Sequence, residues 1–303
     1  MFTILSRAIG FLLIIYLGYF LKQRKVFKHE DGAKLSTLLM NVTLPCSILA
    51  SAAPIPFSFD LLLPFLMGIV GNLILDGFGY YFEKSHQPFK KGIALIQNSG
   101  FNIGTFVIPF VIAFFPSKYM MTVLLFDTGN SIMCIRGNYL LAERIIQGKQ
   151  KQSIKAILKK IVASIPLCTY LMTLTVSLLQ IQVPHLFLNI VSIAGNANPF
   201  VAMLMIGVLV DFHIDRQDVR LLIKRLLQRF VLMGILAGFV YSTFPISLVA
   251  RQMLVLCLLA PISTLGPVYA LQLGSTRSES ANLNSLSIFI SLLMLTFLSM
   301  CFA

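Results

Sequence analysis

The stretch NSGFNIGTFVIP, from Asn98 to Pro109, lies in an apolar part of the chain and yet contains several polar residues and helix breakers. A proline inside a helix removes one backbone hydrogen bond and clashes with the preceding turn, at a cost of about 3 kcal/mol in water. In hydrocarbon the freed carbonyl must find another partner or line a water-filled cavity. The stretch APISTLGP, from Ala260 to Pro267, has the same character. Both therefore predict interrupted membrane helices, with simple proline kinks packed against neighbouring helices as the alternative.

The composition around these stretches is that of an integral membrane protein. The chain has 303 residues, of which 57% are hydrophobic and only 12% are charged, whereas a soluble domain carries about 25% charged residues. Its mean hydropathy is +0.86. Apolar runs of about 20 residues, the length that spans a bilayer, recur along the whole sequence. The expected fold class is therefore an all-α integral membrane protein, embedded in the lipid bilayer of the cell membrane.

The apolar runs predict ten transmembrane segments. We place them at Phe2–Leu21, Lys34–Ala53, Leu61–Phe82, Gly92–Phe115, Met120–Leu141, Ala156–Leu179, Leu186–Val210, Leu221–Phe244, Leu248–Leu273 and Ala281–Phe302.

The basic residues predict how these segments are oriented. The net charge is +13, and 21 of the 24 Lys and Arg residues follow odd-numbered segments. By the positive-inside rule these connections face the cytoplasm and both termini are extracytoplasmic. The basic block from Lys22 to Lys28 follows the first apolar run with no cleavage site, so this run is a first membrane helix and not a signal peptide. Basic residues confined to short connectors indicate contact with anionic lipid and exclude a nucleic-acid interface.

A central polar connector divides the segments into two sets of five. The expected organisation is a first five-helix repeat over residues 1–142, a cytoplasmic connector over 143–155, and a second repeat over 156–303. An odd number of helices in each half forces opposite orientations, as an inverted repeat requires. Pro45 and Pro199 are 154 residues apart, and Pro109 and Pro261 are 152 residues apart. The sequence therefore predicts a 5+5 inverted repeat in which helices 4 and 9 are broken.

These residues resemble the auxin efflux carrier family of plants and its bacterial relatives. The family's fourth helix has an asparagine followed seven positions later by proline, matched by Asn102 and Pro109, although Val107 stands where the family usually has glycine. Its ninth helix has an Ala-Pro pair before small polar residues, matched at Ala260 and Pro261. The resemblance implies that helices 4 and 9 cross at a substrate site. It also implies transport of a small organic anion such as a mono- or dicarboxylate, and a homodimer.

Several polar residues are candidates for binding the substrate. A half-helix that begins inside the membrane points unpaired amides and the positive end of its dipole into the cavity. A carboxylate can be held there without a buried Lys or Arg, and we expect no basic residue at mid-depth in the segments. The side chains that could add hydrogen bonds are Asn98, Asn102, Asn130, Ser263 and Thr264.

Further residues are expected to shape the breaks and to support them. The expected breaks and crossover involve Gly104, Pro109, Pro261, Gly266 and Pro267. Supporting positions in segments two and seven are Asn41, Pro45, Asn198 and Pro199.

Two carboxylates fall within the segments and are candidates for binding a coupling ion or proton. An ionisable group in the bilayer costs at least about 2.5–3.5 kcal/mol on insertion scales, and is a functional candidate for that reason. Asp127 lies near the middle of the fifth segment and Asp76 nearer the cytoplasmic end of the third. A carboxylate beside an anion site repels the substrate unless a proton or Na⁺ neutralises it. A structural, hydrogen-bonded carboxylate is the alternative at both positions.

The pattern favours a secondary transporter that works by alternating access. A sodium-coupled organic anion symporter of the bile-acid type, a channel and a sensor on a transporter fold remain alternatives. The cysteines form no CxxC pair, the histidines show no metal spacing, and no nucleophile or phosphate-loop motif occurs. We therefore expect no enzyme activity, no metal and no cofactor beyond coupling to H⁺ or Na⁺.

Overall fold

The computed structural model contains helices and no strand among the residues that it describes, which are 2–28, 30–50, 62–116, 119–148, 165–210, 219–275 and 278–302. The first half contains α1 (Phe2–Gln23), α2 (Asp31–Leu38), η1 (Leu39–Thr43), α3 (Leu44–Ala50), α4 (Leu62–Phe82), α5 (Pro88–Asn98), η3 (Ile103–Val107), α6 (Ile108–Phe114), α7 (Met120–Ile132), η5 (Met133–Gly137) and α8 (Asn138–Gln147). The second half contains α10 (Ile165–Leu178), α11 (His185–Gly195), α12 (Asn198–Leu209), α13 (Val219–Thr243), α14 (Leu248–Leu258), α15 (Leu265–Gln272) and α16 (Glu279–Phe302).

Helix occurs in each of the ten predicted segments, but not always as one long rod. Within the described part of the chain, six helical stretches are long and apolar enough to cross a membrane. These stretches are Leu5–Gln23, Asp31–Ala50, Leu62–Phe82, His185–Leu209, Val219–Thr243 and Glu279–Phe302. The fourth and ninth segments are interrupted. The predicted connector runs from residue 143 to 155; α8 continues to Gln147, and residues 149–164 lie outside the described ranges.

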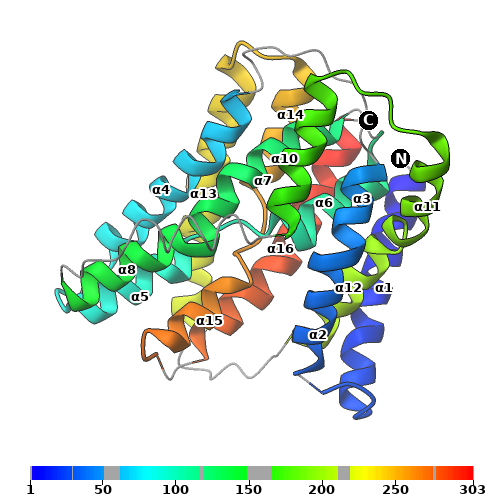
Figure 1. The fold of residues 1–303 in the computed structure, drawn as a ribbon. Helices are drawn as coiled ribbons and strands as arrows, with labels where there is room; N and C mark the ends of the chain where they lie inside the picture. Colours follow the sequence, from blue (N-terminus) through cyan, green and yellow to red (C-terminus); the bar gives the residue numbers. More distant parts are fainter. Residues whose placement is uncertain are drawn as a thin grey trace.

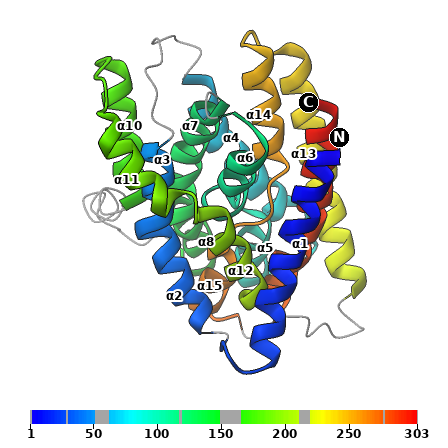
Figure 2. The same ribbon diagram turned by 90° about the vertical axis from the view of Figure 1, so that its right-hand side faces the viewer.

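The helices form two groups that lie side by side (Figures 1 and 2). In the first group, α1 packs along α12, and α3 packs against α10 and α11. In the second group, α4 packs against α5 and α7, α5 packs against α8, and α13 packs against α14. The two ends of the chain lie near each other at one end of the bundle (Figure 1).

Small residues allow close helix contacts in both groups. A Cβ added to Gly129 of α7 would stand 2.1 Å from the carbonyl oxygen of Phe65 in α4, and one added to Gly207 of α12 would stand 2.0 Å from that of Ile15 in α1. Such contacts leave no room for a side chain. Close backbone packing of this kind is a main source of helix association where lipid, and not water, surrounds the protein.

Two of the membrane prolines follow a widened helical turn. The π-helical turn η1 precedes Pro45 in α3, and η3 precedes Pro109 in α6. A proline cannot donate to the carbonyl four residues back and crowds it, and a π-helical turn changes the local spacing of backbone groups. Pro109 therefore lies within a helical stretch that runs from Ile103 to Phe114, and the prediction that it breaks the helix is wrong.

Candidate functional site

The interruptions of the fourth and ninth segments meet each other inside the bundle. The fourth segment is non-helical between Asn98 and Ile103, and the ninth between Leu258 and Leu265. Phe101 and Ile262 form an isolated antiparallel β-bridge. The backbone N–H of Asn102 also donates to the carbonyl of Pro261 at 2.9 Å. Pro261 is thus inside its break, as predicted, while Gly266 and Pro267 lie within the helix that follows, α15.

Side chains of α7 and α4 hold the first break in place. Asn130 accepts a hydrogen bond from the backbone N–H of Phe101 at 3.2 Å and donates to the carbonyl of the same residue at 2.9 Å. The side-chain amide of Asn130 thereby satisfies both the N–H and the carbonyl of Phe101, as an adjacent strand would. Asn72 of α4 accepts from the N–H of Gly100 at 3.0 Å and donates to Asn130 at 3.0 Å. These bonds satisfy backbone groups that lost their helical partners, as burial in a membrane requires.

Side chains of α16 hold the second break in the same manner. Asn284 donates to the carbonyl of Ile262 at 2.8 Å, and the N–H of Ile262 donates to Ser287 at 3.0 Å. Asn130 and Asn284 are 154 residues apart, the same offset that separates Pro45 from Pro199. Each break is therefore satisfied by an asparagine from the next segment in the sequence, α7 for the first break and α16 for the second.

A buried arginine contradicts the expectation that the segments have no basic residue at mid-depth. Arg229 belongs to α13 and is 1% exposed. Its guanidinium donates to the carbonyl of Asn98, and to the carbonyl of Gly100 at 2.8 Å, and it lies 5.3 Å from the ring centroid of Phe101. The count of basic residues grouped Arg229 with those that follow the seventh segment, although its position falls inside the predicted eighth segment, Leu221–Phe244. In the structure α13 carries it inward, where the carbonyls of the first break that lack helical partners accept its hydrogen bonds.

Gly100, which lies in the first break, is another residue that the sequence pattern did not single out. Its φ angle is +80°, a conformation that other residues rarely adopt, and an added Cβ would lie 2.5 Å from the Cβ of Ser263. The two breaks can approach each other only because this position has no side chain.

A cavity of about 170 Å³ lies beside the meeting point of the two breaks. We call it the central cavity. It is bordered by Ser36 and Met40 from the first group of helices and by residues of both breaks, α7 and η5 from the second group. The remaining lining residues are Phe101, Asn102, Ile103, Gly104, Thr105, Asp127, Asn130, Ser131, Cys134, Ile135, Ser263, Thr264 and Leu265. It thus lies between the two groups.

Two helix beginnings face the central cavity. Ile103 and Gly104 open the helical stretch that continues into α6, and Thr264 and Leu265 stand at the start of α15. The first N–H groups of any helix have no partner within it, and the helix dipole makes this end positive. No Lys or Arg is among the described residues that line the cavity. Its polar lining consists of backbone groups, neutral polar side chains and the carboxylate of Asp127.

Asn102 presents an unused donor at this cavity. The residue is 5% exposed, and its side-chain oxygen accepts from the hydroxyl of Thr105. Its Nδ2 is buried and has no hydrogen-bond partner among the described residues. A buried donor without a partner costs about 1–3 kcal/mol, and a bound acceptor would relieve that cost.

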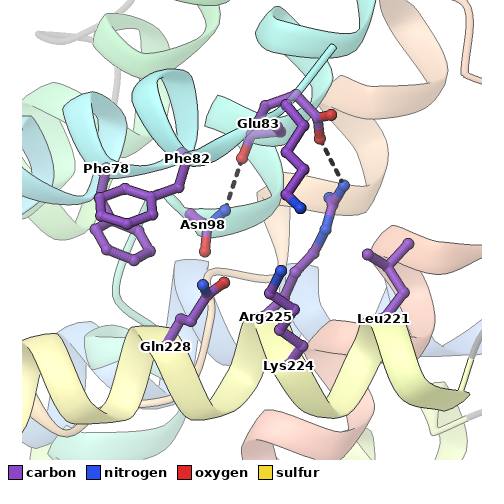
Figure 3. A pocket seen from close by; sticks show the side chains of 11 residues that line it. Phe78, Phe82, Glu83, Asn98, Leu221, Lys224, Arg225 and Gln228 are labelled. Carbon is purple, nitrogen blue, oxygen red and sulfur yellow. Dashed lines mark hydrogen bonds and ion pairs between the residues drawn. The ribbon is translucent and has the colours of Figure 1, made fainter.

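The structure brings most of the predicted substrate-binding residues together. Asn102, Asn130, Ser263 and Thr264 line the central cavity, together with the predicted break residue Gly104. Asn98 does not. It ends α5, donates to the carbonyl of Ala94 at 2.9 Å and lines a separate pocket against α13 (Figure 3). Because the backbone is extended after Asn98, the side chains of Asn98 and Asn102 lie on different sides of the chain.

The two carboxylates occupy different surroundings. Asp127 lines the central cavity, is 5% exposed, and accepts from Asn130 at 3.1 Å. Asp76 lies outside it, is 3% exposed and is within electrostatic reach of Arg229. Neither carboxylate oxygen of Asp76 has a hydrogen-bond partner in the part of the chain that the structure describes.

The supporting residues of segments two and seven are near each other but differ in exposure. Asn198 is fully buried and donates to the hydroxyl of Thr43 at 3.2 Å, which joins α12 to η1. Pro45 is buried in α3, Pro199 is partly buried in the first turn of α12, and Asn41 is exposed.

The long apolar helices are those of a multi-pass membrane protein, and comparison with known proteins gives its family. Residues 3–299 match the family described as "Membrane transport protein". The chain therefore belongs to this family, which is that of the auxin efflux carriers. No curated protein matches the chain in sequence.

Proposed function

We propose that the protein is a secondary carrier that moves a small organic anion, such as a mono- or dicarboxylate, across the cytoplasmic membrane. One observation carries this proposal: two broken helices meet beside a cavity lined by Asn102, whose side-chain amide donor has no partner among the described residues. Two helix beginnings and the hydroxyls of Ser263 and Thr264 would add further hydrogen-bond donors for a carboxylate.

Alternating access would follow from the position of the cavity between the two groups of helices. Ser36 and Met40 belong to one group, and the two breaks belong to the other. A displacement of one group against the other would open the cavity first to one side of the membrane and then to the other. Such motion around a fixed site is the usual mechanism in transporters with broken helices.

The proposal includes a ten-helix 5+5 inverted repeat with both termini extracytoplasmic. Three observations support it: helix in every predicted segment, termini at one end of the bundle (Figure 1), and matched asparagines at the two breaks. An even number of crossings puts both termini on one side, and the distribution of Lys and Arg assigns that side.

Coupling to H⁺ or Na⁺ would depend first on Asp127. An ionised carboxylate at the central cavity opposes the binding of an anion, and a bound cation or proton removes this repulsion. Asp76 is the second candidate, because it lies near the buried charge of Arg229 and outside the cavity.

Uptake and counterflow in proteoliposomes test the proposal. A panel of mono- and dicarboxylates is offered with and without pH and Na⁺ gradients. We expect saturable uptake and accelerated exchange when the same substrate is present on the other side. A channel would conduct without exchange, and dependence on Na⁺ alone would favour the sodium symporter.

The variant Asn102→Ala tests the site itself. A hydrogen bond to a charged group contributes about 1.5–3 kcal/mol, so its loss should weaken the apparent affinity by about 10- to 100-fold. Asn189→Ala is the control, because Asn189 is an exposed asparagine of α11 outside the cavity. Equal transport by the two variants would exclude the central cavity as the substrate site.

A further inference from the structure

A second pocket, which we call the α5–α13 pocket, combines basic and aromatic side chains (Figure 3). It has a volume of about 150 Å³ and lies between α4, α5 and α13. Lys84, Lys224 and Arg225 supply its positive charges, and Phe78, Phe82 and Leu221 supply an apolar wall. A water molecule takes up about 30 Å³ in the liquid, so the pocket has room for a small polar group but not for a large ligand.

The positive charge of this pocket is only partly compensated. Arg225 pairs with Glu83 through Nη2 at 3.0 Å, with the two side chains 15% and 18% exposed. Its Nη1 is buried and has no hydrogen-bond partner among the described residues. Among the described residues that line the pocket, Glu83 is the only acid. Three cations and one carboxylate give the pocket a net charge of about +2, which a ligand with about two negative charges would neutralise.

The surface beside the pocket is apolar and exposed. Phe82 is 62% exposed, and Ile223 and Leu227, which flank the basic pair on α13, are 58% and 62% exposed. On a membrane protein such side chains face lipid tails. Basic side chains adjoining a lipid-facing surface match the two parts of an anionic phospholipid, a charged headgroup and apolar chains. A small soluble anion has no apolar part that could pack against the apolar wall.

We propose that the α5–α13 pocket binds the phosphate-bearing headgroup of an anionic phospholipid. Lys224 and the free Nη1 of Arg225 hold the phosphate, and the lipid chains lie along Phe82 and the outer face of α13. The site is separate from the central cavity, and its occupation would stabilise the contact of α5 with α13. Asn98, at the end of α5, lines this pocket and so connects the site to the first break.

Lipid binding by the purified protein in detergent tests this proposal. Phosphatidylglycerol, phosphatidylcholine and free glycerol phosphate are titrated separately, and binding is followed by native mass spectrometry and by the midpoint of thermal unfolding. We expect phosphatidylglycerol to bind and to raise the midpoint, and the other two to have no comparable effect. Equal effects of the two lipids would overturn the proposal. Binding of glycerol phosphate as tight as that of phosphatidylglycerol would show that the ligand is a soluble anion, and would overturn it also.

Paired variants separate this pocket from general surface charge. The double variant Lys224→Gln/Arg225→Gln should bind phosphatidylglycerol about 30-fold more weakly, since each basic group near an anionic surface contributes about fivefold. The control Lys90→Gln/Arg220→Gln removes two exposed charges that do not line the pocket. An equal loss in the control would overturn the proposal.

A third variant covers the case in which loss of the Glu83–Arg225 ion pair prevents folding. Lys84→Gln/Lys224→Gln leaves that pair intact and changes only exposed side chains. It should weaken binding by at least tenfold, and unchanged binding would refute the assignment.

Discussion

Replacement of Arg229 by methionine should destabilise the break in the fourth segment and abolish transport. The guanidinium is 1% exposed and donates to two buried carbonyls, those of Asn98 and Gly100. Methionine has a similar length and no donor, so both carbonyls would lose their charged partner.

The size of this effect follows from opposing contributions. Each buried acceptor left without a partner costs about 1–3 kcal/mol, which gives an upper value of about 6 kcal/mol for two. Removing a buried charge recovers part of its desolvation cost, and hydrogen bonds inside membrane proteins average only about 0.6 kcal/mol, with values up to about 1.7. We therefore expect a net loss of about 1–3 kcal/mol. Arg229→Lys should lose less stability than Arg229→Met, because lysine keeps the positive charge. It should still be less stable than the wild type, because an ammonium group cannot donate to both carbonyls in the planar geometry of a guanidinium.

Thermal unfolding in detergent and counterflow in proteoliposomes measure the two consequences. The control is Arg220→Met, which changes an exposed arginine of the same helix. The order of stability should be wild type and Arg220→Met, then Arg229→Lys, then Arg229→Met. If Arg229→Met unfolds and transports like the wild type, the arginine does not hold the break.

Three further predictions concern the cavity, the second break and the packing of α7. Asp127→Asn should remove or shift the dependence of uptake on pH or Na⁺ while the protein stays folded; an unchanged dependence in transport assays would move the coupling site elsewhere. Asn284→Ala leaves the carbonyl of Ile262 without its 2.8 Å donor and should reduce counterflow several-fold, and wild-type counterflow would show that the second break needs no support. Gly129→Ala should lower the free energy of unfolding by about 1–3 kcal/mol, as overpacking of a core does, because the added Cβ would lie 2.1 Å from a backbone oxygen of α4. The control is Gly77→Ala, whose added Cβ has nothing within 4 Å. Equal unfolding midpoints of the two variants would contradict the reasoning.

Much of the helical architecture is local information and can be predicted from the sequence. Apolar runs of membrane length must become helices, because lipid offers no hydrogen-bond partners to an open backbone. The two interrupted segments were recognisable for the same reason: polar side chains and helix breakers at mid-membrane indicate a cavity. Asn102, Asn130 and Ser263 could therefore be assigned to one site from the sequence, and all three line the central cavity.

Residue positions relative to the breaks could not be predicted from the sequence. Asn98 and Asn102 are four residues apart and would share a face of an intact helix, yet they line different pockets because the peptide between them is extended. Likewise, the sequence pattern predicts a break at Pro109, while the interruption lies several residues earlier, where Gly100 makes the approach to Ser263 possible.

That the chain is a helical membrane protein with two interrupted segments follows from its amino acids alone, because lipid imposes helix on each apolar run independently of the others. Which groups satisfy those interruptions depends on how the helices pack. Arg229 is distant in sequence from the carbonyls that it binds, and its depth depends on where α13 begins and which helices surround it. A buried charge is stable only beside specific partners, and partners from distant segments are brought together by packing alone.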